Sequence, residues 1–132
     1  MALKLSLKPQ EKVIISKAVL VNGPTATTLL VENNVPVLRE KDILTEEEAT
    51  TYCKKIYLVI QLMYLGEVPN VELATLYGHL AAELQAAVPS TKDLISGITG
   101  DMLNGRYYQA LKQAQQLMHH EEELLTHASE PR

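Results

Sequence analysis

The chain has 132 residues, the length of one ordinary domain, and its 46% hydrophobic and 21% charged residues are typical of a globular protein. Its formal net charge of −4 argues against a protein that coats nucleic acid with its whole surface. There are six tyrosines but no tryptophan or phenylalanine. Every tyrosine lies beyond residue 50, so the first third of the chain has no aromatic ring.

Charge is also distributed unevenly along the chain. Residues 1–44 carry six basic and four acidic side chains, a net +2, whereas residues 45–132 carry six basic and twelve acidic ones, a net −6. The acidic whole is therefore compatible with a locally basic surface in the first third.

The sequence predicts a cytoplasmic protein that does not contact a membrane. The lysine-bearing start of the chain has no apolar run of the kind found in a secretory signal peptide. The longest uninterrupted apolar run, 56–60, is too short to cross a bilayer. Cys53 is the single cysteine and cannot form an internal disulfide, which fits a reducing compartment.

The first third of the chain is predicted to form a small antiparallel sheet. Leu3, Leu5 and Leu7 alternate with polar residues, which gives one apolar and one polar face at the period of a strand. Short β-branched runs follow, and turn signals such as Asn22-Gly23-Pro24 separate them. About five short strands are expected, at residues 3–7, 13–15, 18–21, 27–31 and 35–39.

The remainder of the chain has a helical pattern. Thr45 and Glu48 have the spacing of a capping box and predict a helix that starts here and ends near Gly66. Three further helices are expected at about 71–88, 89–104 and 106–127. The predicted fold class is therefore α+β, with a sheet domain over 1–44 and a bundle of about four helices over 45–132.

The sequence offers little for catalysis. No Ser/His/Asp set or paired-carboxylate arrangement stands out, and no cofactor or metal motif occurs. His119 and His120 are adjacent on a predicted helix, so their side chains diverge by about 100° and cannot share one ion well. Cys53 lies on an apolar helix face and is predicted to be a buried thiol. We expect a protein that is not an enzyme and holds no cofactor.

Basic residues occupy strand positions in the predicted sheet. Lys4 and Lys8 share a face of the first strand, while Arg39 and Lys41 stand at the end of the last one. Lysine and arginine in such positions suit phosphate oxygens, and the planar arginine fork can also read a base edge. From composition alone, however, an ordinary solvated face is favoured over RNA binding.

Several blocks of the sequence resemble the FlbT family of flagellar regulators. They include L-L-V-E-N-N-V-P-V-L-R-E-K-D-I at 29–43 and N-G-R-Y-Y-Q-A-L at 104–111. The resemblance implies a post-transcriptional repressor that associates with the 5′ leader of flagellin mRNA and promotes its degradation. It also implies action alongside FlaF, a small helical protein, and some family members are activators instead.

The first third also resembles CsrA, a small dimeric regulator that binds mRNA leaders. Its last-strand pattern is matched by V-P-V-L-R-E-K-D-I at 35–43, and part of its first-strand pattern by Lys8. The resemblance implies that first and last strands of different subunits grip RNA, hence a possible homodimer through the N-terminal sheet, with Arg39 central. Together with the basic strand residues, it gives the predicted RNA-binding set of Lys4, Lys8, Val37, Leu38, Arg39 and Lys41.

A second class of function remains open. The helical region, with its net charge of −6, would repel RNA and suits a protein-interaction adaptor or chaperone that holds FlaF or flagellin. Both roles are compatible, with RNA on the sheet and a protein on the helices.

Overall fold

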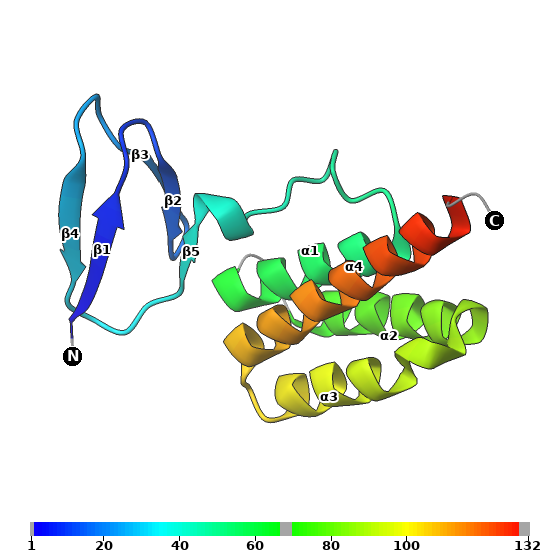
Figure 1. Ribbon diagram of the computed structural model, residues 1–132. Helices are drawn as coiled ribbons and strands as arrows, with labels where there is room; N and C mark the ends of the chain where they lie inside the picture. The colour runs from blue at the N-terminus through cyan, green and yellow to red at the C-terminus, as the bar shows by residue number, and fades with distance from the viewer. Residues whose placement is uncertain (1, 67–69, 130–132) are drawn as a thin grey trace. The chain divides into compact units, whose positions relative to one another are not determined.

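The computed structural model describes residues 2–66 and 70–129 of the chain. Five strands come first, at β1 (Leu3–Leu7), β2 (Lys12–Ile15), β3 (Ala18–Val21), β4 (Thr27–Val31) and β5 (Val37–Arg39). Helices follow: a short 3-10 turn η1 (Glu40–Asp42), α1 (Tyr52–Leu65), α2 (Asn70–Ala87), the 3-10 turn η2 (Pro89–Thr91), α3 (Lys92–Leu103) and α4 (Tyr107–Ser129) (Figure 1). The predicted α+β class is confirmed.

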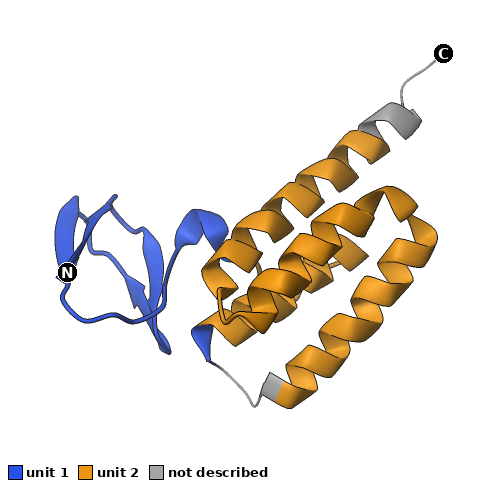
Figure 2. Ribbon diagram, turned by 90° about the horizontal axis from the view of Figure 1, so that it is seen from below, with its two compact units in different colours: residues 1–43, 65–67 blue, residues 44–64, 68–132 orange. Residues whose placement is uncertain are grey.

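The described residues fall into two compact units, coloured separately in Figure 2. The sheet unit holds the strands and η1 as far as Ile43, together with Leu65 and Gly66, and the helical unit holds the rest. The sequence predicts a domain boundary after residue 44, and the chain crosses from one unit to the other between Ile43 and Leu44.

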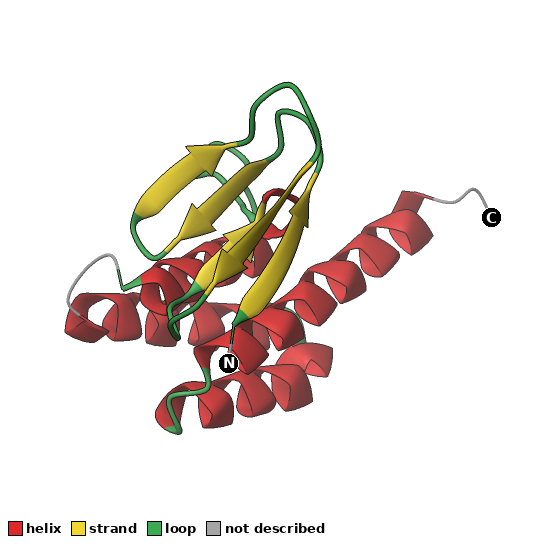
Figure 3. Cartoon of the chain, turned by 90° about the vertical axis from the view of Figure 1, so that its left-hand side faces the viewer, coloured by secondary structure: helices red, strands yellow, loops and turns green. Residues whose placement is uncertain are grey.

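The sheet unit consists of two small antiparallel sheets, drawn in yellow in Figure 3. In one, β1 pairs with β4, with Leu5 opposite Leu29. In the other, β2 lies between β3 and β5, with Val13 opposite both Leu20 and Arg39. Each strand thus finds its hydrogen-bonded partners within this one chain.

The core of the sheet unit follows from the alternation of apolar residues along the strands. Leu5, Leu7 and Val13 are buried, and partly buried side chains from β2, β4 and β5 pack against them: Ile15, Leu29, Val31 and Val37. No residue of β3 belongs to this cluster, and all four residues of β3 are exposed. β3 is therefore an edge strand whose apolar side chains are left in solvent on both faces.

The start of the first helix is a correction to the sequence prediction. The capping-box contacts form as expected, since the N–H of Thr45 donates to Glu48 Oε1 at 3.0 Å and the N–H of Glu48 donates to Thr45 Oγ1 at 3.3 Å. They close an isolated turn, however, and α1 begins only at Tyr52. There Thr51 Oγ1 accepts the N–H of Lys54 at 3.2 Å, which is the N-cap interaction of the helix.

Side-chain contacts join the helices of the helical unit in pairs. Along α1 and α4, Thr51 Oγ1 donates to Glu121 Oε1 at 2.7 Å, and the rings of Tyr64 and Tyr108 lie 5.7 Å apart between centroids. Between α2 and α3, the hydroxyls of Tyr77 and Thr99 are 2.8 Å apart. α1 is buried on nearly all sides, as its apolar sequence predicts for a central helix.

The junction of α3 and α4 is held by a buried carboxylate. Asp101, 9% exposed, accepts hydrogen bonds from Arg106 Nε at 3.2 Å and from Gln113 Nε2. Gly105 makes the turn between the two helices with φ of 72°, a conformation that favours glycine. A Cβ at Gly97 would come within 2.2 Å of Gln113 Oε1, so a side chain there would require the end of Gln113 to move.

Across the described parts of the helices, none is both long enough and apolar enough to pass through a membrane.

Candidate functional site

Three of the predicted RNA-binding residues line one open hollow on the sheet unit. Lys8 follows β1, Arg39 ends β5, and Lys41 lies in η1. The hollow has a volume of about 510 Å³ and is completed by Pro9, Gln10, Glu11 and Glu40. Strand topology therefore gathers three cations that are up to 33 positions apart in the sequence.

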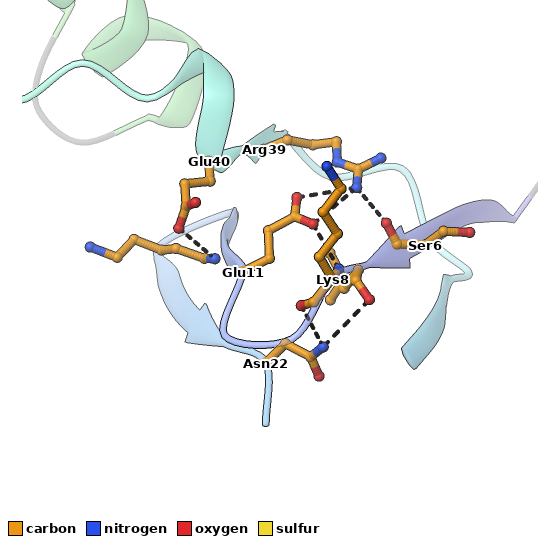
Figure 4. A network of polar contacts seen from close by, with 8 residues as sticks. Ser6, Lys8, Glu11, Asn22, Arg39 and Glu40 are labelled. Carbon is orange, nitrogen blue, oxygen red and sulfur yellow. Dashed lines mark hydrogen bonds and ion pairs between the residues drawn. The ribbon is translucent and has the colours of Figure 1, made fainter. Parts of the chain in front are cut away.

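Arg39 is the centre of the polar network in this hollow, shown from close by in Figure 4. Its Nη2 lies 3.1 Å from Glu11 Oε2 and also donates to the carbonyl oxygen of Ser6. Because Ser6 belongs to β1, the side chain of Arg39 joins β5 to β1. These two strands are not hydrogen-bonded partners in either sheet.

Glu11 is a member of this site that sequence reasoning missed. Its Oε1 accepts the backbone N–H of Lys8 at 2.9 Å while its Oε2 accepts from Arg39. The backbone N–H of Lys8, followed by the Arg39 guanidinium, lowers the pKa of Glu11 below its ordinary value. The spacing of three residues between Lys8 and Glu11 is a local signal for the first contact. No local pattern predicts the contact between Glu11 and Arg39, which are 28 positions apart in the sequence.

The rim of the hollow is held in place by further backbone contacts. Glu40 Oε1 accepts the N–H of Lys12 at 2.9 Å and so ties η1 to β2. Asn22 Nδ2 donates to the carbonyl oxygens of Lys8 at 2.8 Å and Thr25 at 3.0 Å. Gln10 closes the turn with φ of 63°, in the left-handed region. The hollow is thus built from fixed loops and carries three cations and two carboxylates.

The other predicted site residues lie elsewhere. Lys4 is exposed on β1, opposite Leu30 of β4, and does not line the hollow. Val37 packs against the core of the sheet unit, and Leu38 is only 1% exposed. Val37 is therefore partly buried and Leu38 almost fully buried, on opposite faces of β5.

The cysteine and the two adjacent histidines of the helical unit are each either buried or in contact with another side chain. Cys53 is buried as predicted, and burial, with smaller effects of the Glu121 carboxylate, raises its pKa to about 12. His119 pairs with Glu123 at 3.2 Å, and His120 Nε2 lies 3.1 Å from Ser90 Oγ. Within the described residues, no three potential metal ligands come together.

The helical unit does contain an apolar groove. Its volume is about 480 Å³, and it runs between α2 and α3, with one residue each from α1 and α4. The buried Tyr77 and Ile95 lie at its base. On α2 the lining residues Ala74, Gly78 and Ala82 are small, so they leave the groove unfilled. The exposed Leu103 lies on its lining.

Fold and site together define a small α+β protein with a cation-lined hollow on its sheet unit and an apolar groove on its helical unit. Comparison with known proteins extends this description. The family model described as "Flagellar protein FlbT" matches residues 3–125. The chain belongs to the FlbT family.

Three relatives illustrate the similarity. A "Probable flagellum biosynthesis repressor protein FlbT 1" from Bradyrhizobium diazoefficiens is 44% identical over 94% of this chain and 85% of its own length. A "Probable flagellum biosynthesis repressor protein FlbT" from Rhodopseudomonas palustris is 42% identical over 96% of this chain and 99% of its own. The "Flagellum biosynthesis repressor protein FlbT" of Caulobacter vibrioides is 36% identical over 98% and 93%, respectively. No solved structure matches the chain significantly.

Proposed function

We propose that this protein represses flagellum biosynthesis by binding the 5′ leader of flagellin mRNA and promoting degradation of the transcript. Its relatives are named as repressors of flagellum biosynthesis, which supports the direction of the effect. The observation that carries the RNA-binding part is the gathering of Lys8, Arg39 and Lys41 around one hollow. The protein acts by binding in the cytoplasm, without chemistry of its own, and a nuclease cuts the RNA.

The chemistry of the hollow suits a phosphate backbone better than a stacked base. A guanidinium and two ammonium groups make charge-assisted hydrogen bonds to phosphate oxygens. No tyrosine, tryptophan or phenylalanine lies in residues 1–44, so the sheet offers no ring on which a base could stack. Lys4 adds a further cation along β1, whereas the partly buried Val37 and the buried Leu38 would shape the strand rather than contact RNA.

Binding of labelled flagellin leader RNA across a range of salt concentrations tests this proposal. Arg39→Ala and Lys41→Ala are expected to weaken binding, and each lost phosphate contact should reduce the slope of log affinity against log salt by about 0.7 for single-stranded RNA. Lys17→Ala is the matched control, because Lys17 is exposed, lies in the β2–β3 turn and is not part of the hollow. Absence of saturable binding by the wild type would contradict the proposal.

Arg39→Ala needs a second readout, because Arg39 also joins β5 to β1. Thermal denaturation of each variant separates loss of folding from loss of binding. Lys41→Ala removes a cation that makes no ion pair in the described part of the chain. Equal affinity of this variant and the wild type, with Arg39→Ala also unchanged, would show that the hollow is not the RNA site.

The direction of regulation needs a test in cells. If the protein is a repressor of this kind, deletion of its gene should lengthen the half-life of flagellin mRNA. A shortened half-life would instead assign it to the activators. Restoration of the wild-type half-life by the intact gene, but not by the Lys41→Ala variant, would connect the effect to the hollow.

A second candidate function is supported by the apolar groove between α2 and α3. A groove of this kind accepts the apolar face of a helix, so an adaptor or chaperone that holds FlaF or flagellin is the alternative. Ala82→Arg would fill the groove, whereas Ala86→Arg adds the same charge to α2 outside it. Pull-down with purified FlaF or flagellin after nuclease treatment should be lost with Ala82→Arg alone if this role is correct.

A homodimer through the N-terminal sheet is the third element of the proposal. β1, β3, β4 and β5 each pair with one strand only, so each has an open edge. Among them β3 is the strand whose residues are all exposed. β3 bears Val19 and Val21, which are 59% and 60% exposed, and no charge. An uncharged apolar edge strand is self-complementary, so two copies can pair antiparallel about a two-fold axis.

Light scattering over a range of concentrations tests the dimer. The mass should approach twice 14.7 kDa for the wild type and stay near 14.7 kDa for Val19→Lys, which places a charge on the edge. Thr25→Lys, in the exposed loop between β3 and β4, is the matched control and should behave as the wild type. A monomer at every concentration would exclude association through β3.

A further inference from the structure

The anion position of the hollow is already filled by the protein itself. The carboxylate of Glu11 accepts one hydrogen bond from the Arg39 guanidinium at 3.1 Å and one from the backbone N–H of Lys8 at 2.9 Å (Figure 4). A guanidinium and a backbone N–H that converge on one oxyanion are also the donors with which proteins hold phosphate groups. The carboxylate therefore occupies the geometry that a phosphate of bound RNA would need.

The position of Glu11 is well defined by its surroundings. Its side chain is only 12% exposed, while that of Arg39 is 35% exposed. The turn that carries Glu11 is fixed by the left-handed backbone of Gln10 and by the hydrogen bonds from Asn22 to Lys8 and Thr25. Arg39 remains partly open to solvent, so an incoming anion can reach the guanidinium without unfolding the turn.

The remaining cations of the hollow are available to an incoming anion. Lys8 and Lys41 line the hollow, and neither forms an ion pair in the described part of the chain. The positive charges of these lysines attract a phosphate, whereas the negative charge of Glu11 repels it. The local balance of charge therefore depends on whether Glu11 stays in place or moves aside.

We propose that Glu11 is an internal competitor for the phosphate site, and that RNA binds by displacing its carboxylate from Arg39 and the backbone N–H of Lys8. This inference rests on the proposed RNA-binding function. It adds that the Glu11 carboxylate occupies the phosphate position when no RNA is bound. The cost of displacing this carboxylate lowers the affinity of the hollow for any anion. Weakly bound or isolated anions would fail to displace it, whereas a strand with several phosphates would succeed through its additional contacts with Lys8 and Lys41.

The affinity of Glu11→Gln for flagellin leader RNA tests this inference. Glutamine keeps the size of the side chain and an acceptor oxygen for the N–H of Lys8, but it removes the ion pair with Arg39 and the negative charge. We expect binding to tighten by about two- to tenfold at low salt, since an ion pair that solvent reaches on one side and a rim charge have effects of this order. When Arg39→Gln is already present, adding Glu11→Gln should give no further increase in affinity for the RNA.

Glu32→Gln is the matched control for the change in net charge. Glu32 follows β4, is exposed and does not line the hollow. It should leave the affinity within the error of the wild type at moderate salt. Equal tightening by Glu32→Gln and Glu11→Gln would mean that only net charge matters, and would overturn the inference.

A second measurement does not depend on the stability of any variant. The side-chain carboxyl carbon of Glu11, observed by NMR in the wild type, should shift as RNA is added, because the carboxylate leaves Arg39. A resonance that stays unchanged at RNA saturation would contradict displacement even if the hollow binds RNA.

The outcomes separate this inference from the proposed function. If the wild type binds leader RNA and Lys41→Ala weakens binding, but Glu11→Gln binds no more tightly, the function stands and the internal competitor is wrong. If neither the wild type nor Glu11→Gln binds leader RNA, the proposed function itself fails.

Discussion

At the scale of single residues, contacts distant in sequence decide what a side chain does. Arg39 was predictable as a cation on a strand, but its ion pair with Glu11 depends on the packing of β5 beside the turn after β1. The resemblance places Val37 and Leu38 on the RNA surface, whereas in the structure Val37 packs partly against the core of the sheet unit and Leu38 is only 1% exposed. Cys53 was predicted correctly, because an apolar stripe at helical spacing is a local property.

The buried thiol of Cys53 gives a direct prediction. Since burial raises its pKa to about 12, the reactive thiolate is almost absent near neutral pH. Ellman's reagent at pH 8 should modify the folded protein very slowly, and addition of denaturant should make the reaction fast and stoichiometric. Rapid modification of the folded protein would show that Cys53 is accessible.

At the scale of elements, all five strands and the last three helices follow from the sequence, while the start of α1 does not. The Thr45 and Glu48 side chains satisfy each other and the local backbone, but such contacts only close one turn. Continuation as a helix depends on burial of an apolar face, and that face begins with Cys53 and Ile56. The capping motif is therefore present as the sequence predicts, but the helix begins later than the sequence predicts.

The two threonines offer a matched pair for this conclusion. Thr51→Ala removes the N-cap of α1 and the hydrogen bond to Glu121, and it should lower the free energy of unfolding by about 1–2 kcal/mol. Thr45→Ala removes only the contacts of an exposed turn, so its effect should be within about 0.5 kcal/mol. Chemical denaturation of both variants measures the difference, and a larger effect of Thr45→Ala would assign the helix start to the earlier position.

At the scale of the whole molecule, the contrast between a mildly basic first third and an acidic remainder coincides with two compact units. The contrast in charge could be read directly from the sequence. The position of the hollow could not be read in this way, because its lining comes from the turn after β1, from β5 and from η1, which only the topology brings together. The sequence also does not predict the apolar groove between α2 and α3. Helical periodicity shows which residues share an apolar face, but not where two such faces leave a space between them.

This division of charge leads to a prediction about the lysines of the helical unit. Lys92→Ala and Lys112→Ala each remove one exposed cation, as Lys41→Ala does. Because they do not line the hollow and salt screens exposed charges, they should change the affinity for leader RNA by less than about twofold. A loss as large as that of Lys41→Ala would place RNA on the helices as well.

Because the chain is synthesised from its N-terminus, the strands are made before the helices. Every strand finds its partners within residues 3–39, so all three strand pairs can form before α3 and α4 have been made. Lys8, Glu11, Arg39 and Lys41 belong to the same early segment. On a translating ribosome, the residues proposed to bind messenger RNA are thus assembled first, while the helices that carry the apolar groove are still being added.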